Sequence, residues 1–184
     1  MKNNNNMTPD YDLLVQQVKA LGEEENYWLP VLANTSALLM NALPDLNWAG
    51  FYLMNRDSLV LGPFQGNPAC IRIPLCAGVC GAAALQNKVQ RVDDVHQSPG
   101  HIACDSASNA EIVIPIHKNG KLVGVLDLDS PLKNRFTEED EAGLKKIVAA
   151  LEEIAEFTDC TLLFLAQPFF LCYNILVNCI TSLT

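Results

Sequence analysis

The chain has 184 residues, of which 49% are hydrophobic and 18% charged, so its composition fits one globular domain with a sizeable core and excludes a disordered chain. Its net charge of −9 and its pI of about 4.7 argue against binding to a nucleic-acid backbone or to an anionic lipid surface. The sequence contains no basic patch with interleaved aromatic residues, so we expect no nucleic-acid partner.

The seven cysteines indicate a reducing compartment rather than a secreted disulfide framework. Their number is odd, and the first ten residues, MKNNNNMTPD, lack the apolar stretch of a signal peptide. We therefore expect a cytoplasmic protein, in which cysteines are more often catalytic, metal-binding or buried than bridged. A zinc site needs paired ligands at short spacing, and Cys76 and Cys80 have no second pair, so we expect no metal.

Two helices are predicted near the N-terminus. Residues 1–10 contain a run of asparagines and are predicted to be disordered. Apolar residues recur at helical spacing over residues 10–21, and Gly22 is expected to end this first helix. A second helix is predicted over residues 26–43, because apolar residues lie on one face and Pro44 stops it.

A series of short strands follows. Residues 47–54 and 58–62 flank the polar turn NRD and are predicted to pair as an antiparallel hairpin, which places Trp48 and Tyr52 on one face. Residues 69–75 are predicted to form a third strand with an apolar side. That side comprises Ile71, Ile73 and Leu75.

A short helix is predicted over residues 78–88, with Cys80 in its first turn. Free N–H groups and a partial positive charge at a helix start favour a thiolate, so this position predicts a lowered pKa for the Cys80 thiol. A small buried cysteine between two glycines is the alternative, and the sequence leaves both interpretations open.

The clearest pattern in the chain lies at residues 111–130. After a short strand in QRVDDV, two alternating strands are joined by the turn Asn119-Gly120. Asp127 and Asp129 point to the same face of the second strand, because side-chain direction has a period of two. Two adjacent carboxylates repel each other, so we expect them either at a solvated strand end or held by a cation.

A last helix is predicted to begin at Thr137, with Asp140 placed for a capping box. Its expected buried stripe comprises Leu144, Ile147, Val148, Leu151, Ile154 and Ala155. Helices near both ends of an antiparallel sheet predict an α+β fold.

The segment HIACDSASNAE, residues 101–111, sets Cys104 among polar and acidic residues, which is an unusual setting for a core cysteine. It belongs to an ordered set of segments: NWAGFY, LGPFQG, ACIRIP, GVCGAA, DDVH, GHIACDSASNAEIVIP and GVLDLDS. In this order and spacing the chain resembles the free methionine-(R)-sulfoxide reductases, single-domain enzymes with a GAF fold. The resemblance covers residues 29–158.

The resemblance implies roles for three cysteines in the reduction of free L-methionine-(R)-sulfoxide. Cys104 would be the nucleophile, Cys70 its disulfide partner, and Cys80 a further thiol that resolves or relays. Thioredoxin would return the oxidised enzyme to its dithiol form, without a cofactor. The domain would span residues 11–159, and a homodimer stays open.

The resemblance also implies a binding pocket. Trp48 and Tyr52 would line it around the methyl group of the substrate, and a ring of carboxylates would hold the ammonium that only a free amino acid carries. One of these carboxylates, Glu111 or Asp129, would supply the proton as general acid. The matching acidic residues are Asp93, Glu111, Asp127 and Asp129.

Two other interpretations fit the same pattern. A GAF sensing domain would bind a small ligand in the same cavity and signal through its terminal helices. A thiol redox switch would oxidise reversibly without turning over a substrate. Neither would reduce sulfoxides catalytically.

The C-terminal segment 160–184 departs from the resemblance. It has 17 apolar residues among 25 and none that is charged. As one helix it would reach about 37 Å, enough for a bilayer core. Gln167-Pro168 interrupts it, however, and basic flanks are missing, so membrane association is not the favoured expectation and an altered C-terminus explains it equally well.

We expect the purified chain to self-associate through residues 160–184, because such a tail exposes a large apolar patch. Truncation after Asp159 should give a monodisperse, active protein, as measured by size-exclusion chromatography and sulfoxide reduction. An unfolded or inactive truncation would show instead that the tail belongs to the core.

Overall fold

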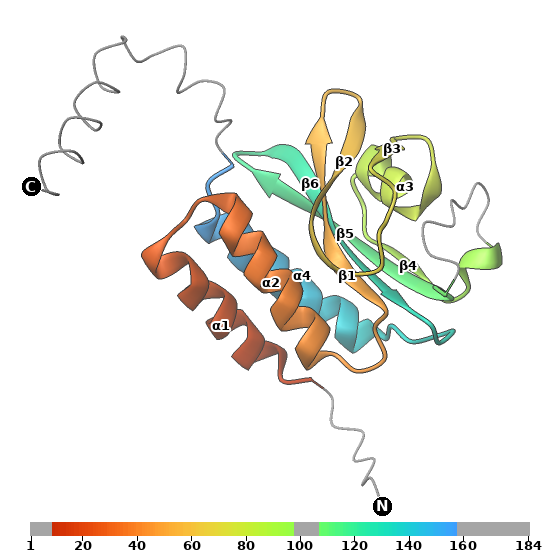
Figure 1. Ribbon diagram of the computed structural model, residues 1–184, viewed down its shortest axis with the longest axis horizontal. Coiled ribbons are helices and arrows are strands. Elements are labelled where there is room, and N and C mark those ends of the chain that lie inside the picture. The colour runs from red at the N-terminus through yellow and green to blue at the C-terminus, as the bar shows by residue number, and fades with distance from the viewer. Residues whose placement is uncertain (1–8, 98–106, 158–184) are drawn as a thin grey trace, which may run out of the picture.

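The computed structural model describes residues 9–97 and 107–157. Residues 1–8 of the segment predicted to be disordered, Cys104, and the C-terminal segment 160–184 lie outside the described residues. Helices α1, α2 and α4 cover one face of a central antiparallel sheet, and α3 lies on the other face (Figure 1). In chain order the elements are α1 (Tyr11–Glu24), α2 (Trp28–Ala42), β1 (Trp48–Asn55), β2 (Ser58–Gly66), β3 (Arg72–Pro74), α3 (Gly78–Gln86), β4 (Gln90–Val92), the 3-10 helix η1 (Val95–Gln97), β5 (Ala110–Lys118), β6 (Lys121–Ser130) and α4 (Glu138–Ile154).

The sheet has the strand order β3-β2-β1-β6-β5-β4, with every neighbouring pair antiparallel. Both predicted hairpins, β1–β2 and β5–β6, are confirmed. Asn119 and Gly120 have φ angles of 53° and 73°, which is the left-handed conformation that a tight two-residue hairpin turn requires. The pairing of β1 with β6 joins the two hairpins and places both at the centre of the sheet.

The main core fills the space between the sheet and the helices α1, α2 and α4. Alternate residues of the central strands point into it, among them Phe51, Ile112 and Leu126, which are fully buried. The first helix does not end at Gly22 as predicted but continues to Glu24. A Cβ at Gly22 would lie 2.9 Å from the Ile154 Cβ, so here glycine allows close helix packing rather than a helix end.

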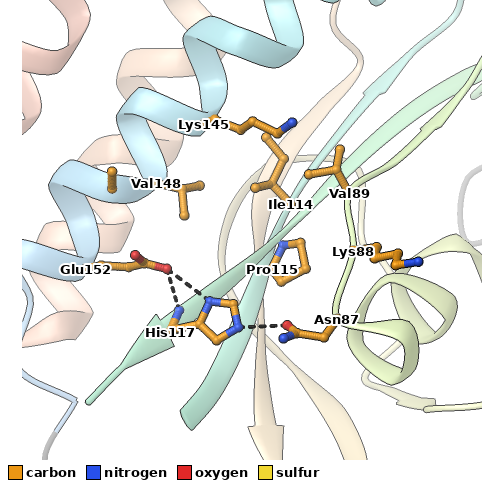
Figure 2. Close-up of a pocket in the computed structure, with 10 residues that line it drawn as sticks. Asn87, Lys88, Val89, Ile114, Pro115, His117, Lys145, Val148 and Glu152 are labelled. Carbon is orange, nitrogen blue, oxygen red and sulfur yellow. Dashed lines mark hydrogen bonds and ion pairs between the residues drawn. The ribbon is translucent and has the colours of Figure 1, made fainter. Parts of the chain in front are cut away.

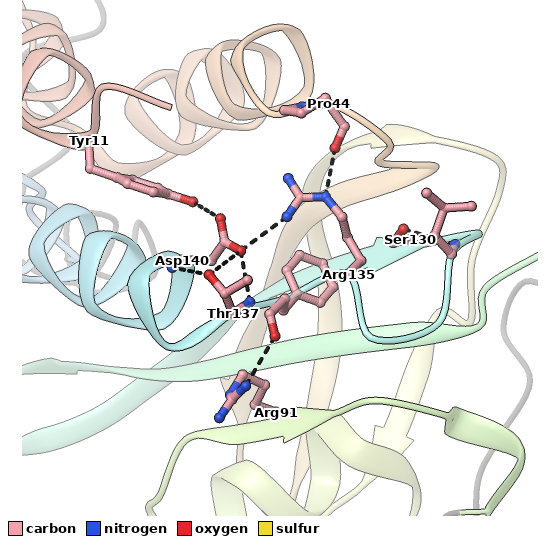
Figure 3. A network of polar contacts seen from close by, with 9 residues as sticks. Tyr11, Pro44, Arg91, Ser130, Arg135, Thr137 and Asp140 are labelled. Atoms are coloured by element: carbon pink, nitrogen blue, oxygen red, sulfur yellow. Dashed lines mark hydrogen bonds and ion pairs between the residues drawn. The ribbon is translucent and has the colours of Figure 1, made fainter. Parts of the chain in front are cut away.

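The predicted cap of α4 is confirmed. The Thr137 hydroxyl accepts a hydrogen bond from the Asp140 backbone N–H, and the Asp140 carboxylate accepts one from the Thr137 N–H. Figure 3 shows that the same carboxylate also accepts from the Tyr11 hydroxyl and pairs with Arg135, at 2.6 and 3.1 Å. Asp140 thereby connects α4 to the first turn of α1. It is 4% exposed, and these partners hold its pKa below its usual value despite burial.

The third strand is shorter than predicted. Only Arg72–Pro74 pair, against the start of β2, and Ile73 alone of the predicted apolar side is buried. Ile71 is 76% exposed and lies outside the strand, so the predicted apolar side does not extend to it. The strand lies at the sheet edge, where only one neighbour holds the backbone, and its apolar residues are not all needed for packing.

The structure confirms an α+β fold with an antiparallel central sheet and helices from both ends of the domain. Within the described residues, no helix combines the length and apolar character needed to cross a membrane.

Candidate functional site

The strand register places four polar or aromatic residues on the sheet face opposite the main core. Trp48 pairs with Asp129, and Asp129 pairs with Glu111 on its other side. Asp127 pairs with Gly50 and Val113. Directly paired residues of an antiparallel sheet point to the same side, so all of these side chains lie on the face that α3 covers. The predicted shared face of Asp127 and Asp129 is confirmed.

Two of these carboxylates are buried. Glu111 is 7% exposed and Asp127 5%, whereas Asp129 is partly exposed. The Cys80 thiol, on α3, reaches both: its Sγ lies 3.2 Å from Asp127 Oδ2 and 3.9 Å from Glu111 Oε1. A solvated strand end is therefore the wrong description of Asp127.

The buried carboxylates lack a basic partner within the described part of the chain. Neither Glu111 nor Asp127 forms an ion pair there with Lys, Arg or His. Burial raises the pKa of Glu111 well above its usual value, and the charges of Asp127 and Asp129 raise it further. Burial also raises the pKa of Asp127. The site therefore favours a bound proton or a bound cation over two bare carboxylates.

The predicted lowering of the Cys80 pKa is wrong. Cys80 does lie in the first turn of α3, but its side chain is 3% exposed. Burial raises the pKa of the thiol well above its usual value, and the neighbouring charges of Asp127 and Glu111 raise it further. A helix start is a weak partial charge, and it is outweighed by loss of water and two nearby carboxylates. Cys80 is thus a protonated thiol that donates a hydrogen bond to Asp127.

Aromatic side chains form a wall beside the carboxylates. The Trp48 ring stacks on Tyr52 at 5.9 Å and on Phe64 at 5.3 Å between ring centroids. A Cβ at Gly50 would lie 2.7 Å from the Trp48 ring, so only glycine at this position leaves room for the ring. The Tyr52 hydroxyl donates to the Cys70 carbonyl at 3.0 Å. Sequence reasoning missed Phe64, because strict alternation from Leu61 would place it on the opposite face. A register shift between the pairs Tyr52–Leu61 and Gly50–Phe64 brings it to the side of Trp48.

Cys70 and Cys80 differ in oxidation state. Cys70 is disulfide-bonded, whereas Cys76 and Cys80 are free, so the partner of Cys70 lies outside the described residues. Cys104 also lies outside them, and its pairing with Cys70 stays a prediction. Cys76 is exposed, on the loop before α3.

The described residues on both sides of the segment that contains Cys104 lie at the carboxylate end of the sheet. Asn109 donates its backbone N–H to the Ser130 carbonyl at 2.7 Å, next to Asp129. Its own carbonyl accepts from the N–H of Val95, in η1, at 2.9 Å. The described residues that precede and follow positions 98–106 are therefore held beside this site.

Asp93 does not belong to the buried cluster. It is exposed in the turn after β4, and its carbonyl accepts a hydrogen bond from the Asn134 N–H. Val92, the residue before it, pairs with Glu111, so Asp93 lies at the same end of the sheet but outside the buried group.

Comparison with known proteins agrees with this geometry. A family model described as GAF domain matches residues 32–156. The free methionine-R-sulfoxide reductase of Escherichia coli (strain K12) is 54% identical over 154 residues, which cover 84% of this chain and 93% of that protein. The chain belongs to the free methionine-R-sulfoxide reductase family. It thereby also has the GAF fold that the resemblance implied.

Solved structures of the free methionine-R-sulfoxide reductase family superpose closely on this chain. The Staphylococcus aureus protein, described in complex with substrate, has a TM-score of 0.77 and 46% identity over 82% of this chain and 98% of its own. The Neisseria meningitidis reductase, also described in complex with its substrate, has a TM-score of 0.75 and 42% identity over 78% and 86% of the two chains.

A separate hollow of about 250 Å³ lies on the main-core side of this reductase-family fold, between α4, β5 and the end of α3 (Figure 2). His117 stands at its lower edge, between the Glu152 carboxylate and the Asn87 side-chain oxygen. Its ring is thus held by two partners, at 3.3 and 2.7 Å. None of the residues that the resemblance singled out lines this hollow.

Proposed function

We propose that this chain reduces free L-methionine-(R)-sulfoxide to methionine in the cytoplasm, with thioredoxin as the reductant. The observation that carries the proposal is the buried pair Glu111 and Asp127, which has no basic partner among the described residues and lies beside the aromatic wall. Relatives from S. aureus and N. meningitidis described in complex with substrate support the same assignment.

The carboxylates would bind the ammonium of a free amino acid. A buried negative charge is stabilised by a cation within hydrogen-bonding distance, and a charge-assisted hydrogen bond contributes roughly 1.5–3 kcal/mol. A methionine sulfoxide inside a protein carries no ammonium at this position. The cluster would therefore select the free amino acid, while the rings of Trp48 and Tyr52 would pack against its apolar end.

The thiol chemistry would need two cysteines. The Cys104 thiolate attacks the sulfoxide sulfur, the oxygen passes to Cys104 as a sulfenic acid, and methionine leaves. The Cys70 thiol then attacks the Cys104 sulfur, water leaves, and a disulfide forms. A dithiol of thioredoxin reduces this disulfide. The disulfide-bonded state of Cys70, and the place of the described residues that flank positions 98–106 beside the carboxylates, support this division of roles.

Glu111 would supply the proton for the departing oxygen. Burial raises its pKa well above the usual value, and the charges of Asp127 and Asp129 raise it further, which favours the protonated form that a general acid needs. Asp129 is less buried and is the weaker candidate for the general acid. Cys80 would act as a hydrogen-bond donor that orients Asp127 rather than as a second thiolate.

The test is turnover with three substrates: free R-sulfoxide, free S-sulfoxide and a peptide-bound R-sulfoxide. Thioredoxin, thioredoxin reductase and NADPH provide the reductant, and NADPH oxidation is followed. We expect oxidation with free R-sulfoxide alone. A sensing domain would bind a ligand without any NADPH oxidation, and a redox switch would consume at most one equivalent. Either result would overturn the proposal.

A further inference from the structure

We propose that Cys80, Glu111 and Asp127 form a site for a zinc ion, and that zinc bound there blocks the substrate site. The blocking part rests on the proposed function, whereas the binding part does not. Sequence spacing gave no hint of this site, because its three residues come from α3, β5 and β6 and meet only in the folded chain.

The three ligand atoms lie close to the separations of a tetrahedral zinc site. One ligand atom from each of the three side chains lies within 4.8 Å of the other two. A zinc ion with typical Zn–S and Zn–O bonds separates a sulfur and an oxygen ligand by about 3.6 Å. The two observed distances from the Cys80 sulfur, 3.2 and 3.9 Å, bracket this separation.

An unused ligand atom points to the same conclusion. Asp127 is only 5% exposed, and its second carboxylate oxygen, Oδ1, is buried without a hydrogen-bond partner. A buried acceptor without a donor costs free energy, which a coordinated cation would recover. With no basic residue paired to Glu111 or Asp127 in the described chain, a divalent ion would also offset their charges.

The donor set selects the class of metal. One sulfur and two carboxylate oxygens suit zinc, whereas magnesium and calcium prefer oxygen-only sites with six or more ligands. On binding, the Cys80 thiol releases its proton to solvent and coordinates as the thiolate. Three protein ligands leave the fourth position for water. The ion would occupy the place proposed for the substrate ammonium, so the two should compete.

The experiment uses the full chain with Cys70, Cys76, Cys104, Cys160, Cys172 and Cys179 replaced by serine, so that Cys80 is its single thiol. Zinc binding is measured by calorimetry, and Co²⁺ is the spectroscopic probe because cobalt–thiolate bonds absorb in the near ultraviolet. We expect one equivalent of metal with a cobalt–thiolate band. Cys80→Ser should abolish the band, and Asp127→Asn should weaken zinc binding at least about tenfold, the effect of 1.4 kcal/mol.

Controls separate this inference from the proposed function. The parent chain without the Cys76→Ser change should bind zinc at this site with the same affinity, since Cys76 is exposed on another segment. Free methionine-(R)-sulfoxide, which a chain without Cys104 would not reduce under the proposed function, should raise the apparent Kd for zinc. Absence of zinc binding, or binding unchanged in folded Cys80→Ser and Asp127→Asn, would overturn the metal site even if turnover is normal. Zinc binding without turnover would instead count against the reductase assignment alone.

Discussion

Cys104→Ser should abolish methionine formation, whereas Cys70→Ser should release one methionine per chain and then stop. The nucleophile is needed for the first chemical step, so its loss removes every later one. The resolving thiol is needed only to convert the sulfenic acid into a disulfide that thioredoxin can reduce. The measurement is rapid-quench release of methionine, compared with steady-state NADPH oxidation for the same variants.

Cys76→Ser is the matched control, because Cys76 is an exposed free thiol on the loop before α3 and has no role in the proposed cycle. It should leave both the burst and the steady-state rate unchanged. Sustained turnover by Cys104→Ser would remove the central assignment. Sustained turnover by Cys70→Ser would transfer the resolving role to another cysteine.

Asp127→Asn should raise KM for free methionine-(R)-sulfoxide by about tenfold to 150-fold. The change removes the charged partner of the substrate ammonium, whose hydrogen bond contributes roughly 1.5–3 kcal/mol, and each 1.4 kcal/mol corresponds to a factor of ten. Glu111→Gln should lower kcat, because an amide cannot supply the proton for the departing oxygen. Unchanged kinetic constants in both variants would contradict the proposed pocket.

Glu111→Gln should not destabilise the fold. The pKa of Glu111 in the folded chain is raised above its ordinary value of 4.5. As pH rises past 4.5, the unfolded chain loses this proton while the folded chain keeps it, so ionisation favours unfolding. Glutamine does not titrate. Glu111→Gln should therefore gain free energy of unfolding relative to the unmodified chain as pH rises from about 4.5 towards neutrality, which urea titrations at several pH values measure.

The elements with local signals were predictable from the sequence. The turn Asn119-Gly120, the capping residues Thr137 and Asp140, and the alternation of β5 and β6 are each encoded within a few neighbouring residues. Period-two alternation also placed Trp48 and Tyr52 on one face of β1. The same alternation placed Asp127 and Asp129 together on one face of β6. Those parts of the site follow from strand geometry alone.

The parts that depend on packing were not predictable. Gly22 was read as a helix end, but its role is contact with Ile154 on a helix far along the chain. Cys80 was assigned a lowered pKa from its place in a helix, but its ionisation is set by burial against Asp127 and Glu111. Which residues face each other across α3, β5 and β6 is a tertiary property, and no short sequence window contains it.

The most direct test of the account is a single turnover of the pre-reduced chain with racemic free methionine sulfoxide and no added reductant. The account predicts one methionine per chain, consumption of the R diastereomer alone, and a new disulfide between Cys70 and Cys104 in the peptide map. Binding of the sulfoxide without methionine release, or consumption of the S diastereomer, would contradict it.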